Sequence, residues 1–293
     1  MVSTHSERPF LFLIGTQKSG TTWLRDCFAH RCRFCQWQEW YLPEFAAAIE
    51  QHIQTYSQGM SEGDQEGCAR TTIQAGWQAM LGSANADKSA YPCVDNLGRL
   101  RPELHRRAVE YARRYFPGAR VVVLVRDPRA VLNSLQHYLL RQGWPTRIDV
   151  TTFAQQWVLQ NQQWRDDKPD AWIRYEDLKR DFKRTLKHAL CAADLPTPDP
   201  LISSVFQSEY DIQRHRARQP EIYRTGTIDE WRDNLSTRQL NTIHRIAGDF
   251  MQDCGYCPQR SSRPPTIDRG KRALGRAFRR CTAPRPKLSR PVP

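Results

Sequence analysis

The chain has 293 residues, 39% of them hydrophobic, and carries 44 Lys and Arg residues against 31 Asp and Glu residues, for a formal net charge of +13. This length and apolar content allow a sizeable buried core, and the nine cysteines are an odd number, which together argue against a small scaffold built on disulfides. The apolar run nearest the N-terminus, residues 10–14, is too short for a membrane span or a signal peptide, so we expect a cytoplasmic protein.

The first predicted elements are a strand at residues 10–14 and a helix at residues 21–31. The strand is a continuous apolar run, typical of strands buried on both faces. The helix is indicated by apolar residues at three- and four-residue spacing from Trp23 to Phe28. The turn between them, GTQKSG, directs backbone N–H groups, two hydroxyls and one ammonium toward a helix N-terminus, where the helix dipole favours an anion. We therefore predict that this turn binds a phosphate or a sulfate.

The turn differs from the nucleotide-binding P-loop G-x-x-x-x-G-K-[ST], in which a Lys follows the second Gly and the next hydroxyl binds Mg²⁺. Gly15 and Gly20 keep the P-loop spacing, but Thr21 stands where that Lys is expected, and Lys18 lies inside the loop. A triphosphate donor needs Mg²⁺, whereas a less charged phosphosulfate can be bound by Lys and backbone donors alone. We therefore expect a site without a metal, and keep a P-loop kinase of a small molecule as the alternative.

The segment TQKSGTTW resembles the 5′-phosphosulfate loop, typically PKSGTTW, of sulfotransferases that use 3′-phosphoadenosine 5′-phosphosulfate (PAPS). The resemblance implies that Lys18 is catalytic, because its ammonium would stabilise the charge that develops on the bridging oxygen of the donor. It also implies that Trp23 packs against the adenine, although the periodicity of its helix equally allows a core residue. The donor-binding residues implied in this segment are Lys18, Ser19, Gly20, Thr21, Thr22 and Trp23.

Residues 36–100 show little regular strand or helix pattern, and their aromatic residues fit either the core or an acceptor pocket: Trp37, Trp40, Tyr41, Trp77 and Tyr91.

Within this segment, DKSAY (residues 87–91) resembles the E-K-S-x-x-Y segment of carbohydrate-type sulfotransferases. The resemblance implies that Asp87 is the catalytic base and that Lys88 lies by the sulfuryl group. Asp87 is one methylene shorter than Glu, and one residue is missing before the Tyr. Glu39 and Glu44 therefore remain alternative bases. Without a function, Asp87 is expected to be a solvated carboxylate in a loop.

A predicted helix at residues 103–115 precedes a buried strand at 121–125 and a helix at 129–141. Arg126 follows the strand, and Ser134 follows eight residues later, a pattern that resembles the 3′-phosphate motif of the same sulfotransferases. A guanidinium fork and a hydroxyl suit a phosphate monoester. Asp127, next in the chain, is read either as a metal ligand of a kinase or as the N-cap of the following helix.

A helix at 152–164, a strand at 171–175 and a helix at 176–192 complete the regular pattern. The segment RYEDL resembles the family segment whose Tyr contacts the adenine, which assigns this role to Tyr175. The segment YRTGTIDEW resembles the late R-K-G loop that closes over the 3′-phosphate, with Trp231 as its anchor. A Thr replaces the usual Lys of that loop, so one cationic contact is missing. The residues in its first three places are Arg224, Thr225 and Gly226.

Strands that alternate with helices in this order predict a single α/β domain with a parallel, doubly wound sheet. The function that the resemblance implies is transfer of the sulfuryl group from PAPS to a hydroxyl or amine, with release of 3′-phosphoadenosine 5′-phosphate. We expect a small-molecule or carbohydrate acceptor and no nucleic acid as substrate. A noncatalytic nucleotide-binding module is a third possibility, and the oligomeric state is left open.

We predict a sulfotransferase domain at residues 1–262 and a basic, Pro- and Arg-rich tail at 263–293 that is largely disordered. The tail holds ten Lys and Arg residues against one acidic residue. A purely solvated tail and contact with a membrane surface, nucleic acid or an acidic partner are both open. Two C-x₂-C pairs also allow four zinc ligands, but the plainer expectation is buried packing and no metal. Their residues are Cys32, Cys35, Cys254 and Cys257.

Overall fold

The computed structural model describes residues 9–35, 39–94, 102–144, 147–211, 217 and 226–257. Residues 1–258 belong to one compact unit, and residues 259–293 form a second one. The predicted tail lies outside the described residues. The strands and helices of the first unit are β1 (Leu11–Thr16), α1 (Thr21–Phe28), α2 (Leu42–Tyr56), α3 (Glu62–Leu81), β2 (Ala86–Tyr91), α4 (Pro102–Arg106), α5 (Ala108–Tyr115), β3 (Arg120–Val125), α6 (Pro128–Arg141), α7 (Val150–Asp166), β4 (Ala171–Arg174), α8 (Tyr175–Arg180), α9 (Phe182–Ala192), α10 (Asp199–Glu209), α12 (Trp231–Asn234) and α13 (Thr237–Asp253).

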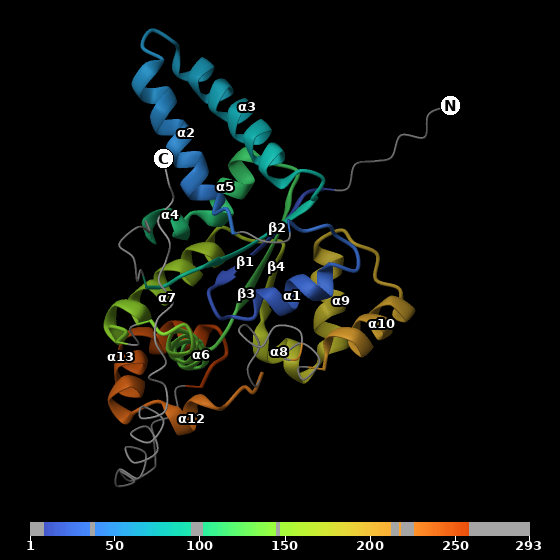
Figure 1. The fold of residues 1–293 in the computed structure, drawn as a ribbon, viewed down its shortest axis with the longest axis vertical. Coiled ribbons are helices and arrows are strands. Elements are labelled where there is room, and N and C mark those ends of the chain that lie inside the picture. Colours follow the sequence, from blue (N-terminus) through green and yellow to red (C-terminus); the bar gives the residue numbers. More distant parts are fainter. Residues whose placement is uncertain are drawn as a thin grey trace, which may run out of the picture. The chain divides into compact units, whose positions relative to one another are not determined.

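The described strands form a parallel sheet in the order β2-β1-β3-β4 (Figure 1). The chain moves outward from β1 to β2, then crosses to β3 on the other side of β1 and continues to β4. The predicted parallel, doubly wound α/β fold is therefore confirmed. The strand order reverses between β1 and β3, and ligands of such sheets bind beyond the carboxyl ends of the strands at this switch point.

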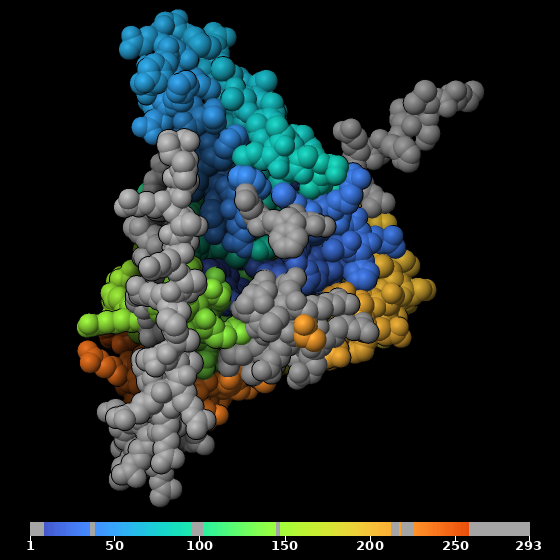
Figure 2. All heavy atoms as spheres, viewed as in Figure 1, coloured from blue at the N-terminus to red at the C-terminus, as the bar shows by residue number. Residues whose placement is uncertain are grey.

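Both faces of the sheet are covered by helices, which explains the continuous apolar runs 11–14 in β1 and 121–125 in β3. Leu11 and Leu13 pack on one face in a cluster with α1, α9 and α10. Phe12 and Ile14 pack on the other face with α2, α3 and α5. A third cluster joins α6, α7, α12 and α13 beside the end of β3. In the space-filling view, α2 and α3 lie at the top and α10 at the right (Figure 2).

The segment 36–100, which shows little pattern in the sequence, contains two helices and an edge strand. Helix α3 buries one side chain per turn, a stripe too narrow to stand out, and its buried residues are Ala69, Ile73, Trp77 and Leu81. Strand β2 reads ADKSAY and is nevertheless mostly buried, because segment 33–35 and helices α2 and α3 cover its edge and face. Trp77 and Tyr91 are core residues, Trp40 and Tyr41 are partly buried against the same cluster, and Trp37 lies outside the described residues.

Two of the predicted helices are divided. The helix predicted at 103–115 is interrupted at Arg107, and the one predicted at 176–192 is interrupted at Asp181. Both interruptions leave the helical region of backbone conformation, at ψ 13° and ψ 69° respectively. Tyr175, predicted as the last strand residue, begins α8 instead.

Within the described ranges, none of the helices combines the length and apolar character that a bilayer span requires. The same part of the chain contains no group of three or more His, Cys, Asp or Glu side chains arranged to hold a metal ion. Cys32 and Cys254 belong to different buried clusters, and the described part of the chain does not join the two C-x₂-C pairs in a metal-binding group.

Candidate active site

The turn between β1 and α1 is built on two glycines that no other residue replaces without displacement. A Cβ on Gly15 would lie 2.7 Å from the backbone oxygen of Leu124 in the neighbouring strand. Gly20 has a left-handed φ of 96°, and a Cβ there would lie 2.6 Å from the ring of Tyr175. The glycine spacing seen in the sequence is thus required by β3 on one side and by the start of α8 on the other.

The start of α1 supplies unsatisfied hydrogen-bond donors to this turn. Gly20, the N-cap residue, has no side chain to cap the helix, and the first turn contains no acidic residue. The first N–H groups of a helix have no partner within the helix. In addition, the hydroxyl of Ser19 is buried and meets no hydrogen-bond partner among the described residues. Thr21 is buried, whereas Thr22 is partly exposed. A buried hydroxyl without a partner at an uncapped helix start fits the bound anion that the sequence predicts.

Lys18 lies within the turn between β1 and α1 and has a positive φ of 70°. Its ammonium sits 4.3 Å from the centre of the Tyr138 ring on α6. Burial lowers the pKa of Lys18 to about 8, with further lowering by the charges of Arg141 and Arg126, while Glu39 acts in the opposite direction. An ammonium so surrounded by cations is arranged to receive negative charge. The contact with Tyr138 was not foreseen, although this Tyr lies four residues after Ser134 on the same helix.

Arg126 connects the turn with two other segments of the chain. It donates to the backbone oxygen of Lys18 at 3.0 Å and to that of Thr227 at 3.3 Å. Its guanidinium also lies 4.2 Å from the centre of the Tyr175 ring. The hydroxyl of Tyr175 in turn donates to the backbone oxygen of Gly226 at 3.3 Å. Residues that are far apart in the sequence thus meet at the carboxyl ends of β1, β3 and β4.

The remaining donor-site predictions have mixed structural settings. Ser134 is partly buried on α6. Trp23 is a core residue with 3% exposure, packed edge-on to Tyr175, and its indole N–H donates to the backbone oxygen of Glu209 at 2.6 Å. Arg224 and Thr225 lie outside the described residues.

Asp127 is the N-cap of α6, as one of the two readings of the sequence predicts. Its carboxylate accepts the backbone N–H of Arg129 at 2.9 Å and forms an ion pair with the Arg129 side chain at 2.6 Å. Both of its oxygens are occupied by this guanidinium. A carboxylate held in this way is not arranged as a metal ligand.

The candidate bases lie in three different environments. Asp87 is 3% exposed at the second position of β2, opposite Phe12, and accepts a hydrogen bond from Ser89 at 3.0 Å. Burial raises the pKa of Asp87 to about 7. The interpretation of Asp87 as a solvated loop carboxylate is therefore wrong, because the chain around it is a buried strand. Glu44 instead lies 3.3 Å from the Nε2 atom of His105.

Glu39 is the candidate base that lies with the cations of the site. It forms an ion pair with Lys88 and accepts a hydrogen bond from the Tyr41 hydroxyl at 3.0 Å. The negative charge of Glu39 also acts on Lys18, where it partly offsets the lowering of the Lys18 pKa. The structure thus brings together Lys18, Lys88 and Glu39, whereas Asp87 lies deeper in the sheet.

Comparisons with known proteins identify the family and the fold. A sequence model of the sulfotransferase family matches residues 9–199. The structure is similar to mouse sulfotransferase SULT7A1 complexed with PAP, with a TM-score of 0.57 and 15% identity over 88% of this chain and 90% of that chain. This similarity is one of fold.

Two sulfotransferase domains align with lower TM-scores. The domain from the curacin biosynthetic pathway has a TM-score of 0.48 and 15% identity over 85% of this chain and 98% of that chain. The domain from the Synechococcus PCC 7002 olefin synthase has a TM-score of 0.46 and 17% identity over 83% and 94%. No curated protein sequence matches the chain significantly.

Proposed function

The chain belongs to the sulfotransferase family, and we propose that it transfers the sulfuryl group of PAPS to a hydroxyl or amine of a small-molecule or carbohydrate acceptor. The observation that carries the proposal is the meeting of the Lys18 turn, Arg126 and Tyr175 beyond the carboxyl ends of the strands. The PAP bound in the mouse structure of similar fold supports the same donor. No feature of the site favours the kinase alternative, since the carboxylate of Asp127 is occupied by Arg129.

The turn and the start of α1 would bind the 5′-phosphosulfate, and Arg126 with Ser134 would bind the 3′-phosphate. The buried Ser19 hydroxyl supports the first assignment, because a bound anion would give it a partner. Tyr175 supports both parts of the site, since its ring packs between Gly20 and the Arg126 guanidinium. Its adenine contact, that of Trp23, and the part of residues 224–226 in closing the site stay predictions.

When bound, PAPS supplies an activated sulfuryl group whose bond to the bridging oxygen breaks as the acceptor oxygen or nitrogen bonds to sulfur. Lys18 would stabilise the negative charge left on that bridging oxygen. The ammonium must be protonated to do so, and its pKa of about 8 keeps it mostly charged at neutral pH. Lys88, which is paired with Glu39, would add a second positive charge on the acceptor side.

We propose Glu39, rather than Asp87, as the base that removes the acceptor proton. Glu39 is partly exposed, forms an ion pair with Lys88 and lies near Lys18. Asp87 is also influenced by the Lys88 charge, but it is almost fully buried in β2. The test compares Glu39→Gln with Asp87→Asn. Loss of kcat with unchanged donor affinity in Glu39→Gln alone supports this assignment, and the reverse pattern restores Asp87.

The proposed donor is tested by measuring the binding of 3′-phosphoadenosine 5′-phosphate to the protein. Calorimetric titrations are done with and without a chelator of divalent metals. Binding that persists with the chelator supports the proposal. Binding that requires Mg²⁺ and prefers ATP would instead favour a kinase. Incubation with labelled PAPS and a cell extract, followed by mass spectrometry, identifies an acceptor as a product that gains one sulfuryl group.

We also propose that residues 1–262 are sufficient for turnover and that the basic tail acts through electrostatic contact with a membrane surface or an acidic partner. Every motif assigned to the reaction lies upstream of the tail. Deletion of residues 263–293 should leave kcat on a small acceptor nearly unchanged. A salt-dependent loss of vesicle binding on deletion would identify the tail as a tether, and a large loss of kcat would contradict the proposed domain limit.

A further inference from the structure

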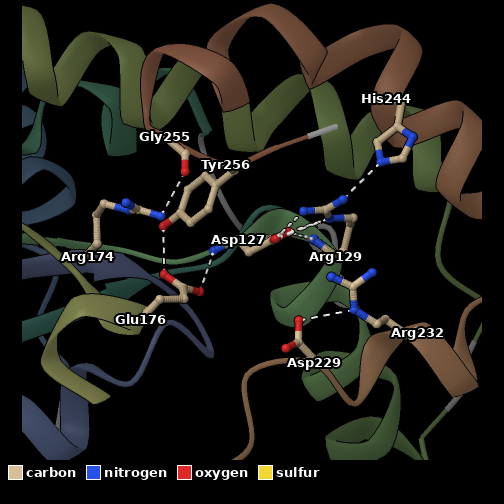
Figure 3. Close-up of polar contacts among 9 residues, drawn as sticks. All are labelled: Asp127, Arg129, Arg174, Glu176, Asp229, Arg232, His244, Gly255 and Tyr256. Atoms are coloured by element: carbon tan, nitrogen blue, oxygen red, sulfur yellow. Dashed lines mark hydrogen bonds and ion pairs between the residues drawn. The ribbon is translucent and has the colours of Figure 1, made fainter. Parts of the chain in front are cut away.

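The backbone that carries Arg126 is fixed by a buried carboxylate from α8. Asp127, the next residue, donates its N–H to Oε1 of Glu176 at 3.1 Å. The hydroxyl of Tyr256 donates to Oε2 of the same carboxylate at 2.9 Å (Figure 3). Glu176 and Tyr256 are 2% and 4% exposed, so both oxygens of this carboxylate are used inside the protein.

A nearby cation and the two hydrogen-bond donors oppose the effect of burial on Glu176. Burial raises the pKa of Glu176, the guanidinium of Arg126 lowers it, and the Asp127 carboxylate raises it. Two hydrogen-bond donors aimed at one carboxylate further stabilise its ionised form. Glu176 is therefore both a hydrogen-bond acceptor for the Arg126 turn and an opposite charge close to the Arg126 side chain.

Tyr256 is held in place independently of Glu176. The guanidinium of Arg174 lies 4.5 Å from the centre of its ring and donates to the backbone oxygen of Gly255 at 3.0 Å. Gly255 has a φ of 74°, and a Cβ there would lie 3.0 Å from Arg174. The contacts with Arg174 therefore fix the position of Tyr256, and its hydroxyl lies within hydrogen-bond distance of Glu176.

The other side of the same turn is supported from α12 and α13. The guanidinium of Arg129, which is paired with Asp127, lies 4.0 Å from the centre of the Trp231 ring. It also lies 3.2 Å from Nε2 of His244 (Figure 3). Trp231, His244 and Tyr256 all lie beyond residue 199, where the match to the family model ends.

We propose that Glu176 and Tyr256 are positioning residues that hold the Arg126 turn in the geometry that recognises the 3′-phosphate of the donor. The inference rests on the proposed function, because it gives the end of the domain a part in donor recognition. Arg126 reaches the backbone oxygens of Lys18 and Thr227 from this turn, so a displaced turn would misalign its guanidinium with a phosphate.

The test measures the dissociation constants of 3′-phosphoadenosine 5′-phosphate and of AMP, which lacks the 3′-phosphate, by calorimetry. Tyr256→Phe removes a single hydroxyl from the pair. It should lower the preference for the 3′-phosphorylated nucleotide by about fivefold to tenfold, the scale for the loss of one typical hydrogen bond. Glu176→Ala should lower it further, and the double variant should equal Glu176→Ala, because Tyr256 acts through Glu176.

Tyr111→Phe is the matched control. Tyr111 is a buried tyrosine of α5 whose hydroxyl donates to Glu50 at 2.9 Å, in the core cluster of α2, α3 and α5. It should lose a similar amount of thermal stability while the nucleotide preference stays at the wild-type value.

Three results would overturn the inference. A preference within about twofold of wild type in both Tyr256→Phe and Glu176→Ala would show that the pair only supports the fold, since such a change is below the scale of one hydrogen bond. An equal loss in Tyr111→Phe would show that the effect is general loosening. A wild-type protein that does not prefer the 3′-phosphorylated nucleotide would overturn the proposed donor site itself, and the inference with it.

Discussion

Gly20→Ala tests how closely Tyr175 confines the anion-binding turn. The added Cβ would lie 2.6 Å and 2.7 Å from two atoms of the Tyr175 ring, at a backbone φ of 96°. The positive φ alone costs of order 1–3 kcal/mol for a residue other than glycine. The ring has little freedom to move, because the Arg126 guanidinium lies against it and Trp23 packs edge-on to it.

Gly59→Ala separates the two contributions. Gly59 has a positive φ of 94°, close to that of Gly20, but a Cβ there meets no atom within 4 Å. It therefore carries backbone strain without a clash. Overpacking adds about 1–3 kcal/mol, so Gly20→Ala should be destabilised by about that much more than Gly59→Ala.

Thermal denaturation and calorimetric titration with 3′-phosphoadenosine 5′-phosphate measure the two effects. A displaced turn no longer directs its N–H groups at the anion, so donor affinity should fall about tenfold or more in Gly20→Ala, which corresponds to about 1.4 kcal/mol, and not in Gly59→Ala. If both variants bind the nucleotide like wild type and unfold at the same temperature, the turn is not confined by Tyr175 and the reasoning fails.

The other predictions concern charge. Lys18→Ala should lower turnover by about 10²-fold or more. Wild-type activity should also fall as the pH rises through about 8, where Lys18 loses its proton. A pH-rate profile that stays flat to pH 10 would contradict this role. Arg126→Ala and Ser134→Ala should weaken binding of the 3′-phosphorylated nucleotide by about 1.5–3 kcal/mol for a charge-assisted contact, with little change for adenosine 5′-phosphosulfate; equal losses for both nucleotides would indicate a purely structural role. The folded-state pKa of Asp87 is raised to about 7, so its contribution to stability is present at low pH and is lost as the pH rises toward and through 7. Asp87→Asn should therefore raise the free energy of unfolding at pH 8 but not at pH 4, measured by urea denaturation, and an unchanged value at pH 8 would refute the buried ionisation.

The features of this protein that depend on neighbouring residues in the chain could be predicted from its sequence. The continuous apolar runs of β1 and β3 indicate strands covered on both faces, because only a sheet buried between helices accommodates such runs. The spacing of Gly15 and Gly20 before a helix predicts an anion-binding turn for a similar local reason, since glycines and a helix start act within a few residues.

Tertiary structure decided the contacts between distant segments. The polar residues of ADKSAY do not indicate a buried strand. Asp87 is buried because segment 33–35 and helices α2 and α3 cover the edge and face of β2. Lys88 meets Glu39 across 49 residues, and Tyr256 meets Glu176 across 80. Neither pair has a periodic signature, because the attraction between two side chains depends on their distance in space. The sequence therefore identified the turn that we propose to bind the donor, while tertiary structure decided which carboxylates lie beside the cations of the site.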